Sequence, residues 1–319
     1  MKLRYLAGQK PEKENFQIFK ETMEDLFNED SKVVYLDADL MGSLKTQDLW
    51  KRYPNNVLNC GIQEANMVGV ACGLFLNGFK PYIHSFSPFA SRRVFDQLFL
   101  SVGYGHKSVR VIASDAGIMA THNGGTHMCF EDIAMMRTVP EACVVDVSDP
   151  TMLGQFLRMT KDRPGLTYIR MPRRDLPDIY LPDTRFEEGK GKILREGKDL
   201  TLIGNGIMVA TCLDAADMLV KEGISARVVD IVTTKPLDTE LVLECAEKTG
   251  KIITAENGNV IGGLGSAVCE YLSSARPTPV FKIGVNDEFG CVGGEQFLRE
   301  KYHMTALDIV LMAKKIVEE

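Results

Sequence analysis

The sequence lacks the features that mark an extracellular, membrane or metal-centred protein. Its eight cysteines are scattered without a Cys-x-x-Cys pair. We therefore expect no disulfide framework or zinc site, but reduced, mostly buried thiols of a cytoplasmic protein. No run of 18 apolar residues is present, so no membrane span is expected. Residues 1–4 are not followed by the apolar stretch of a signal peptide.

The chain also has no large excess of positive or negative charge. The formal net charge is −6, and the 37 lysines and arginines form no basic run, so a nucleic-acid partner is not indicated. No internal repeat or low-complexity segment occurs. A chain of 319 residues is long enough for about two domains, each with its own core.

Short β-rich runs alternate with helical patterns along the whole chain, which predicts an α/β fold of two doubly wound domains with mainly parallel sheets. In the first half we expect strands at 33–36, 81–83, 109–113, 142–147 and 166–170, and helices at 16–28 and 64–76. In the second half we expect strands at 200–204 and 226–231, a helix at 210–222 and a helix opening near 261–265.

A segment rich in proline, glycine and charge, 176–191, interrupts the periodicity. We therefore place the first domain at 1–178, the linker at 179–191 and the second domain at 192–319. The Gly204-Asn205-Gly206 turn lacks the third glycine of a dinucleotide-binding loop, so we interpret it as a tight turn from strand to helix.

Glu64 is the most informative residue, because the residues that follow it are small and apolar, as on a buried helix. An ionised carboxylate there must find a partner, take up a proton or destabilise the fold. The alternative is a glutamate at a helix start, where the dipole favours it. Nearby glycines, Gly61, Gly69 and Gly73, would let a flat cofactor approach closely and favour a functional role.

The segment Gly61-Ile62-Gln63-Glu64-Ala65-Asn66-Met67 resembles the thiamine diphosphate (ThDP) enzymes of the transketolase group. The resemblance runs from about residue 15 to the end. It corresponds to a pyrimidine-binding domain followed by a transketolase C-terminal domain, which is the C-terminal subunit of a split transketolase. It implies that Glu64 donates a hydrogen bond to the aminopyrimidine ring of ThDP and so promotes loss of the thiazolium C2 proton.

Other residues take roles from the same resemblance. Phe86 and Phe89 match the aromatic platform of the pyrimidine ring, although single aromatics in such a segment are more often core residues. Asp39 matches a cofactor position, but would equally cap a turn. His127, in Gly124-Gly125-Thr126-His127, matches a catalytic histidine that faces the reacting carbonyl.

At the substrate end, the resemblance implies that Ser43, Asn123 and Arg173 bind sugar or phosphate groups. Three positions depart from the family pattern. Asn123 stands at an acidic position, Asp115 at a common histidine position, and Phe16 near a phosphate-binding arginine position. We therefore expect a sugar other than xylulose 5-phosphate, and high efficiency with that sugar would contradict this expectation.

The metal-binding Gly-Asp-Gly motif of the family is absent from the sequence. We expect this chain to hold no metal itself, and an N-terminal subunit to bind Mg²⁺ and the diphosphate. Two copies of each chain would form a heterotetramer that contains a homodimer contact.

The predicted reaction moves a two-carbon ketol unit from a ketose, or ketose phosphate, to an aldose or its phosphate. Two related enzymes are alternatives: deoxyxylulose phosphate synthase, normally one long chain, and the β subunit of 2-oxoacid dehydrogenases, whose loop normally lacks the Thr126-His127 ending. A non-catalytic scaffold subunit is the alternative from another class, and retention of Glu64, Phe86, Phe89 and His127 together weighs against it.

Overall fold

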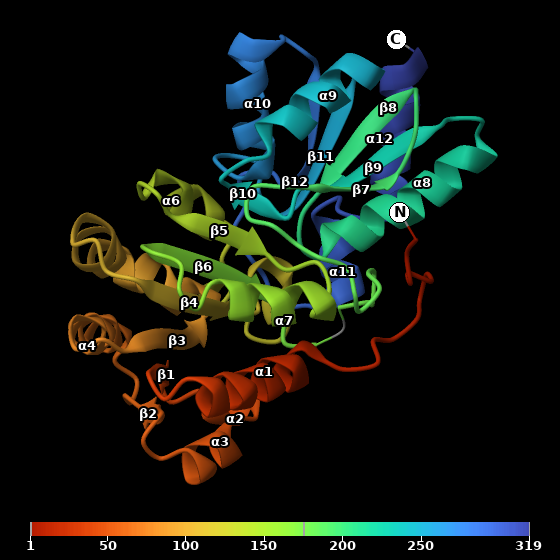
Figure 1. The fold of residues 1–319 in the computed structure, drawn as a ribbon. Helices are drawn as coiled ribbons and strands as arrows, with labels where there is room; N and C mark the ends of the chain where they lie inside the picture. The colour runs from red at the N-terminus through yellow and green to blue at the C-terminus, as the bar shows by residue number, and fades with distance from the viewer. Residues whose placement is uncertain (1, 175, 319) are drawn as a thin grey trace.

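The computed structural model describes residues 2–174 and 176–318. It consists of two α/β units, each built on its own sheet, with the first unit in red to green and the second in green to blue (Figure 1). The larger sheet has seven strands in the order β10-β5-β6-β4-β3-β1-β2, and the smaller has five in the order β12-β11-β8-β9-β7.

The elements of the first half are α1 Asn15–Glu29, β1 Val33–Asp37, α2 Met41–Leu44, α3 Gln47–Arg52, β2 Val57–Asn59, α4 Glu64–Leu76, β3 Lys80–Phe86, α5 Ser87–Ala90, η1 Arg92–Val94, η2 Gln97–Tyr104, β4 Val109–Ser114, η3 Gly117–Ala120, η4 Gly124–Thr126, α6 Asp132–Thr138, β5 Cys143–Asp146, α7 Pro150–Met159 and β6 Leu166–Met171. Those of the second half are β7 Lys192–Arg195, β8 Leu200–Gly204, α8 Met208–Lys221, β9 Ala226–Asp230, β10 Thr233–Lys235, α9 Thr239–Thr249, β11 Ile252–Asn259, α10 Leu264–Ala275, β12 Val280–Val285, α11 Glu295–Lys301 and α12 Ala306–Glu318.

The prediction of two α/β domains with mainly parallel sheets is confirmed. Among the strands described, only the pairs β10–β5 and β7–β9 are antiparallel. The expected strands and helices are present to within a few residues, and α4 and β8 have the expected bounds. The cysteines are free thiols, and most of them are buried.

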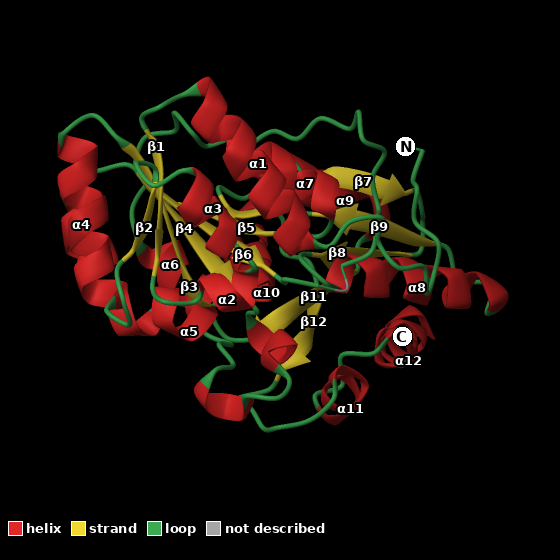
Figure 2. Cartoon of the chain, turned by 90° about the horizontal axis from the view of Figure 1, so that it is seen from below, coloured by secondary structure: helices red, strands yellow, loops and turns green. Residues whose placement is uncertain are grey.

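The expectation that α4 is a buried helix is wrong for the chain on its own. One side of α4 packs on β3 through Met67, Val68 and Ala71, but Gly69 and Leu76 lie on an exposed side. Figure 2 shows α4 at the outer edge of the molecule. The sequence pattern predicted burial because α4 carries apolar residues on its exposed side as well, and this pattern is typical of helices that are packed on both sides.

The two units interlock. β10 follows β9 in the second half, yet it pairs with β5 at the edge of the larger sheet (Figure 1), and the sequence did not predict this strand. The segment 176–191 contains no helix and only one isolated bridge, as its composition indicates, but its Leu176, Ile179 and Tyr180 side chains are buried in the main core. The connection between the units is therefore packed and not a loose tether.

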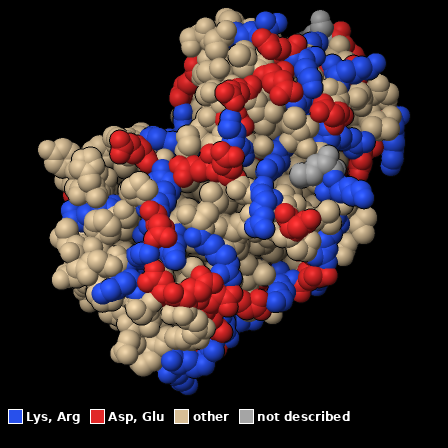
Figure 3. All heavy atoms as spheres, in the orientation of Figure 1, with Lys and Arg blue, Asp and Glu red and all other residues tan. Residues whose placement is uncertain are grey.

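Charges of both signs are mixed on the surface in view. On the face drawn in Figure 3, lysine and arginine alternate with aspartate and glutamate. Within 2–174 and 176–318, no helix is long and apolar enough to cross a membrane.

Candidate active site

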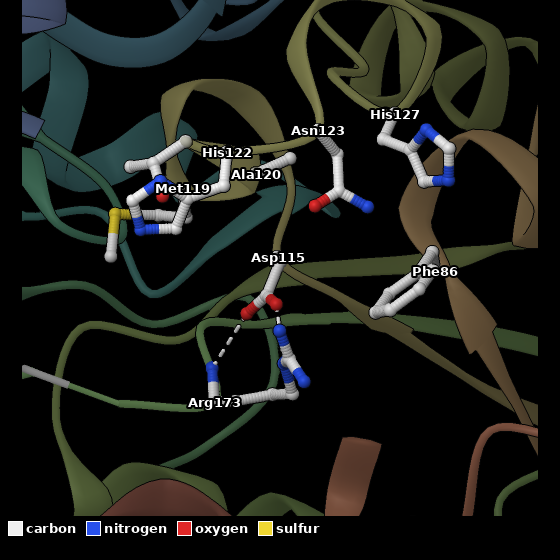
Figure 4. Close-up of a pocket in the computed structure, with 9 residues that line it drawn as sticks. Phe86, Asp115, Met119, Ala120, His122, Asn123, His127 and Arg173 are labelled. Carbon is white, nitrogen blue, oxygen red and sulfur yellow. Dashed lines mark hydrogen bonds and ion pairs between the residues drawn. The ribbon is translucent and has the colours of Figure 1, made fainter. Parts of the chain in front are cut away.

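The candidate site lies at the carboxyl ends of three neighbouring parallel strands, β3, β4 and β6, which is where open α/β sheets bind ligands. A cavity of about 330 Å³ opens there beside the glycine-rich loop that follows β4. Its walls are formed by Phe86, Asp115, Met119, Ala120, Thr121, His122, Asn123, His127 and Arg173 (Figure 4).

Glu64 is the first residue of α4 and is only 3% exposed. The Ser85 hydroxyl donates to its Oε1 at 3.0 Å, and Nη1 of Arg93 donates to its Oε2 at 2.8 Å. The carboxylate has thus found partners, and it also lies at the helix N-terminus, where the dipole favours an anion. The helix-start interpretation of Glu64 is therefore confirmed, and its role towards a cofactor stays a prediction.

Phe86, Phe89 and His127 form an aromatic cluster. The ring centroids of Phe89 and His127 are 5.1 Å apart, those of Phe86 and His127 are 5.9 Å apart, and both contacts are edge to face. Each phenylalanine carries a guanidinium over its ring: Arg93 lies 3.8 Å from the centroid of Phe89, and Arg173 lies 5.3 Å from that of Phe86. Each half-buried phenylalanine therefore has one face of its ring covered by a guanidinium group.

His127 is placed by the short 3₁₀ turn η4, which ends immediately before it. Its Nδ1 lies 2.9 Å from the Thr126 hydroxyl, so the Nε2 side of the ring is left for another partner. Arg92 donates to the Thr126 carbonyl at 3.2 Å and to Glu131 at 2.8 Å. The imidazole itself is positioned at the edge of the cavity by its edge-to-face contacts with Phe86 and Phe89.

Asp115 and Arg173 form an ion pair at the other end of the cavity (Figure 4). Asp115 adopts a positive φ of 52° directly after β4, and its carboxylate accepts from the Arg173 backbone N–H at 3.0 Å and from Nε. Nη1 of Arg173 also donates to the Ser43 carbonyl at 3.0 Å. Burial raises the pKa of the Asp115 carboxyl, and the Arg173 charge opposes that rise.

The remaining predicted residues differ in how close they lie to the cavity. Asn123 lines the cavity, and Ser43 reaches Arg173 through its backbone only. Asp39 is exposed, is not part of the cavity wall, and accepts from the Asn59 amide at 2.9 Å. Asn59 in turn accepts from the Gly61 N–H at 2.9 Å, so Asp39 supports the turn that leads into α4.

Sequence reasoning missed Arg93. Its only signal was a basic residue four positions after Phe89, and that spacing does not say which of two adjacent arginines would reach Glu64. His122 and Met119, which also line the cavity, were missed because nothing in their sequence context distinguishes them from loop residues.

The residues present fit part of a large cofactor. A buried carboxyl beside two aromatic faces suits a flat nitrogen heterocycle. Among the described residues, however, no group of three or more histidine, cysteine, aspartate or glutamate side chains is arranged to hold a metal ion.

Comparisons with known proteins identify the family of both halves of the chain. The family model "Transketolase, pyrimidine binding domain" matches residues 12–178, and "Transketolase, C-terminal domain" matches residues 189–309. The chain is 44% identical over 289 residues to the 6-deoxy-6-sulfo-D-fructose transketolase subunit SqwH of Clostridium sp. (strain MSTE9), covering 91% of this chain and 90% of the relative.

The chain is also 38% identical to the putative transketolase C-terminal section of Methanocaldococcus jannaschii, with 94% of each chain covered. A solved structure described as a split gene transketolase, inactive beta4 tetramer, superposes with a TM-score of 0.89 at 42% identity. That match covers 96% of this chain and 98% of the solved one.

Proposed function

This chain belongs to the transketolase family, and from that premise we propose that it is the C-terminal subunit of a split, ThDP-dependent transketolase. It would move a two-carbon ketol unit from a ketose to an aldose. The observation that carries the proposal is Glu64, a nearly fully buried carboxyl at the start of α4, beside the aromatic cluster of Phe86, Phe89 and His127.

When bound, ThDP would supply an acidic thiazolium carbon that attacks the ketose carbonyl. Glu64 would hold a proton at its carboxyl and donate it to a ring nitrogen of the aminopyrimidine. Its 3% exposure keeps water away from that hydrogen bond. Phe86 and Phe89 would orient the ring by contact with its faces.

His127 would act on the substrate. With Nδ1 engaged by Thr126, its Nε2 can donate a hydrogen bond to the oxygen on which negative charge develops when the carbonyl is attacked. Asn123, which lies on the same side of the cavity as His127, has an amide that can bind a sugar hydroxyl (Figure 4). This division gives Glu64 and His127 the catalytic roles.

The diphosphate and Mg²⁺ would be held by an N-terminal partner subunit, because the sequence has no Gly-Asp-Gly motif. A large interface is supported by apolar side chains exposed around α4, with Ile62 73% exposed, Leu76 70% and Tyr104 81%. The similar solved chain, described as an inactive beta4 tetramer, supports a subunit that needs a different partner for activity. We propose two copies of each chain in a cytoplasmic heterotetramer.

The substrate is proposed to differ from xylulose 5-phosphate at its far end. Asp115 neutralises Arg173, so this end of the cavity offers little net positive charge to a phosphate dianion. A relative named for a sulfonated sugar supports variation at that end. Within the chain, 1–178, 179–191 and 192–319 are proposed as pyrimidine-binding domain, linker and C-terminal domain.

The test is to purify the chain from its native lysate with whatever subunit accompanies it, and to measure ThDP, Mg²⁺ and ketol transfer on a panel of sugars. We expect a stoichiometric partner, bound cofactor and transfer that is lost in Glu64→Gln. The matched control is Glu131→Gln, which removes a carboxylate that pairs with the neighbouring Arg92. A chain that elutes without ThDP would contradict the proposal and favour the scaffold alternative.

A further inference from the structure

Arg93 occupies the space that a flat ring would need between Glu64 and Phe89. Its guanidinium stacks 3.8 Å above the centroid of Phe89, and its Nη1 donates to Glu64 Oε2 at 2.8 Å. A guanidinium is planar, has N–H donors in its plane and stacks well on aromatic rings. It therefore satisfies both groups in the way that a flat nitrogen heterocycle would.

The two occupants exclude each other. A separation of 3.8 Å between the guanidinium carbon and the ring centre is van der Waals contact, so no ring fits between Arg93 and Phe89. The Oε2 atom of Glu64 is also engaged by Arg93, while Oε1 is engaged by Ser85. A heterocycle that stacks on the same face of Phe89 and takes the place of Nη1 at Glu64 Oε2 must displace the arginine.

We infer that Arg93 covers the pyrimidine-binding site of the free subunit and is displaced when the cofactor binds. Arg93 thereby sets the affinity of this site, the pyrimidine seat, for the aminopyrimidine ring. The inference rests on the proposed function, because the ring is taken to be the aminopyrimidine of ThDP. It adds a residue that governs cofactor loading and that neither the family match nor the relatives' names assign.

Displacement is physically easy. The Arg93 side chain is 44% exposed, and the turn that carries it, η1, lies at the surface, so the guanidinium can move into water without unfolding anything. The ion pair is open to water at its Arg93 end only, so solvent screens it in part, and holding the long arginine side chain in place costs entropy. The buried carboxylate is meanwhile kept partnered until the cofactor arrives, which avoids an unpaired buried charge.

The neighbouring Arg92 provides a matched control. It lies on the same turn, is 43% exposed and also forms an ion pair at 2.8 Å. Its partner is Glu131, and its second contact is the Thr126 carbonyl. Removing Arg92 therefore deletes the same type of side chain without uncovering Phe89 or Glu64.

The test uses the full chain and thiamine as the probe, because thiamine carries the aminopyrimidine and needs no metal or partner. Its dissociation constant is measured by ligand-observed NMR titration for wild type, Arg93→Ala and Arg92→Ala. We expect Arg93→Ala to bind thiamine about fivefold to tenfold more tightly than wild type, because one partly exposed ion pair and one stacking contact no longer compete with the ligand. Arg92→Ala should stay within about twofold of wild type.

Equal or weaker binding by Arg93→Ala, including none, would overturn the inference, and so would the same gain in Arg92→Ala. The proposed function is tested separately by the ThDP content of the purified complex. If the wild-type complex contains ThDP and transfers ketol units but Arg93→Ala binds thiamine no better, the inference about Arg93 is refuted and the proposed function stands. If that complex contains no ThDP, the proposed function fails, and the titration still reports whether Arg93 covers a seat for flat rings.

Discussion

Replacing Asp115 should change which sugars the cavity accepts. Asn is the suitable replacement, because it keeps an oxygen for the Arg173 N–H and tolerates the positive φ of 52° at this position. The variant therefore removes the carboxylate charge with little change of shape. It leaves the Arg173 guanidinium free to face a ligand anion.

The size of the effect follows from the repulsion that Asp115 exerts on such an anion. For an anion held on the far side of the same guanidinium, at about 5.5 Å from the carboxylate, the repulsion is about 1.5 to 3 kcal/mol per unit charge at an effective dielectric constant of about 40 to 20. Arg173 is 25% exposed and the cavity is open, so we expect the lower end. A change of about 1.4 kcal/mol is tenfold, so preference for a charged sugar should rise about tenfold or more per unit charge.

The assay compares kcat/KM for a ketose phosphate with kcat/KM for the same ketose without phosphate, using the complex with its partner subunit. The ratio should rise at least about tenfold in Asp115→Asn. Glu295→Gln is the control, since Glu295 lines the adjoining cavity but pairs with Arg299 at 2.8 Å. An unchanged or lower ratio in Asp115→Asn, or an equal rise in the control, would refute the electrostatic reasoning.

Three further outcomes are expected. His127→Asn should lower kcat about 10²–10³-fold with little change in ThDP binding, since removing one oxyanion donor has that effect; unchanged kcat would contradict its role. Arg170→Met should destabilise the fold by about 3–5 kcal/mol in urea unfolding, because it strands the buried Asp132 and Asp146 carboxylates; a loss below about 1 kcal/mol would show that they are not charged partners. Burial raises the pKa of Glu256 from 4.5 to about 7, so between these pH values the folded state binds a proton at Glu256 that the unfolded state has lost. The contribution of Glu256 to the free energy of unfolding therefore falls as pH rises from 4.5 to about 7. Glu256→Gln should flatten that fall in unfolding free energy, and an unchanged slope would exclude Glu256 as its source.

Much of the fold was readable from the sequence because its signals are local. The apolar run at β8 and the small apolar run of α4 closed by Asn77-Gly78 gave the correct bounds. β10 was not readable, because three residues that pair across domains leave no periodicity of their own. The exposure of α4 was missed for a related reason: composition shows that a helix is apolar, but not which chain covers it.

The candidate site divides in the same way. The family-like segments placed Phe86, His127, Asn123 and Arg173 around one cavity, as expected. The pairing of Asp115 with Arg173 and of Arg93 with Glu64 joins residues far apart in sequence, 58 and 29 positions respectively. Only the folded sheet brings such residues together, so their charges could be counted in advance but their partners could not.

The strand β10 limits where this protein can be divided. A gene cut within 179–191 would yield a first half whose sheet ends at an unpaired β5 edge and a second half whose β10 has lost its partner strand. Unpaired edges recruit other strands, so the first fragment would tend to aggregate. The pairing of β10 with β5 therefore favours keeping both domains in one polypeptide chain.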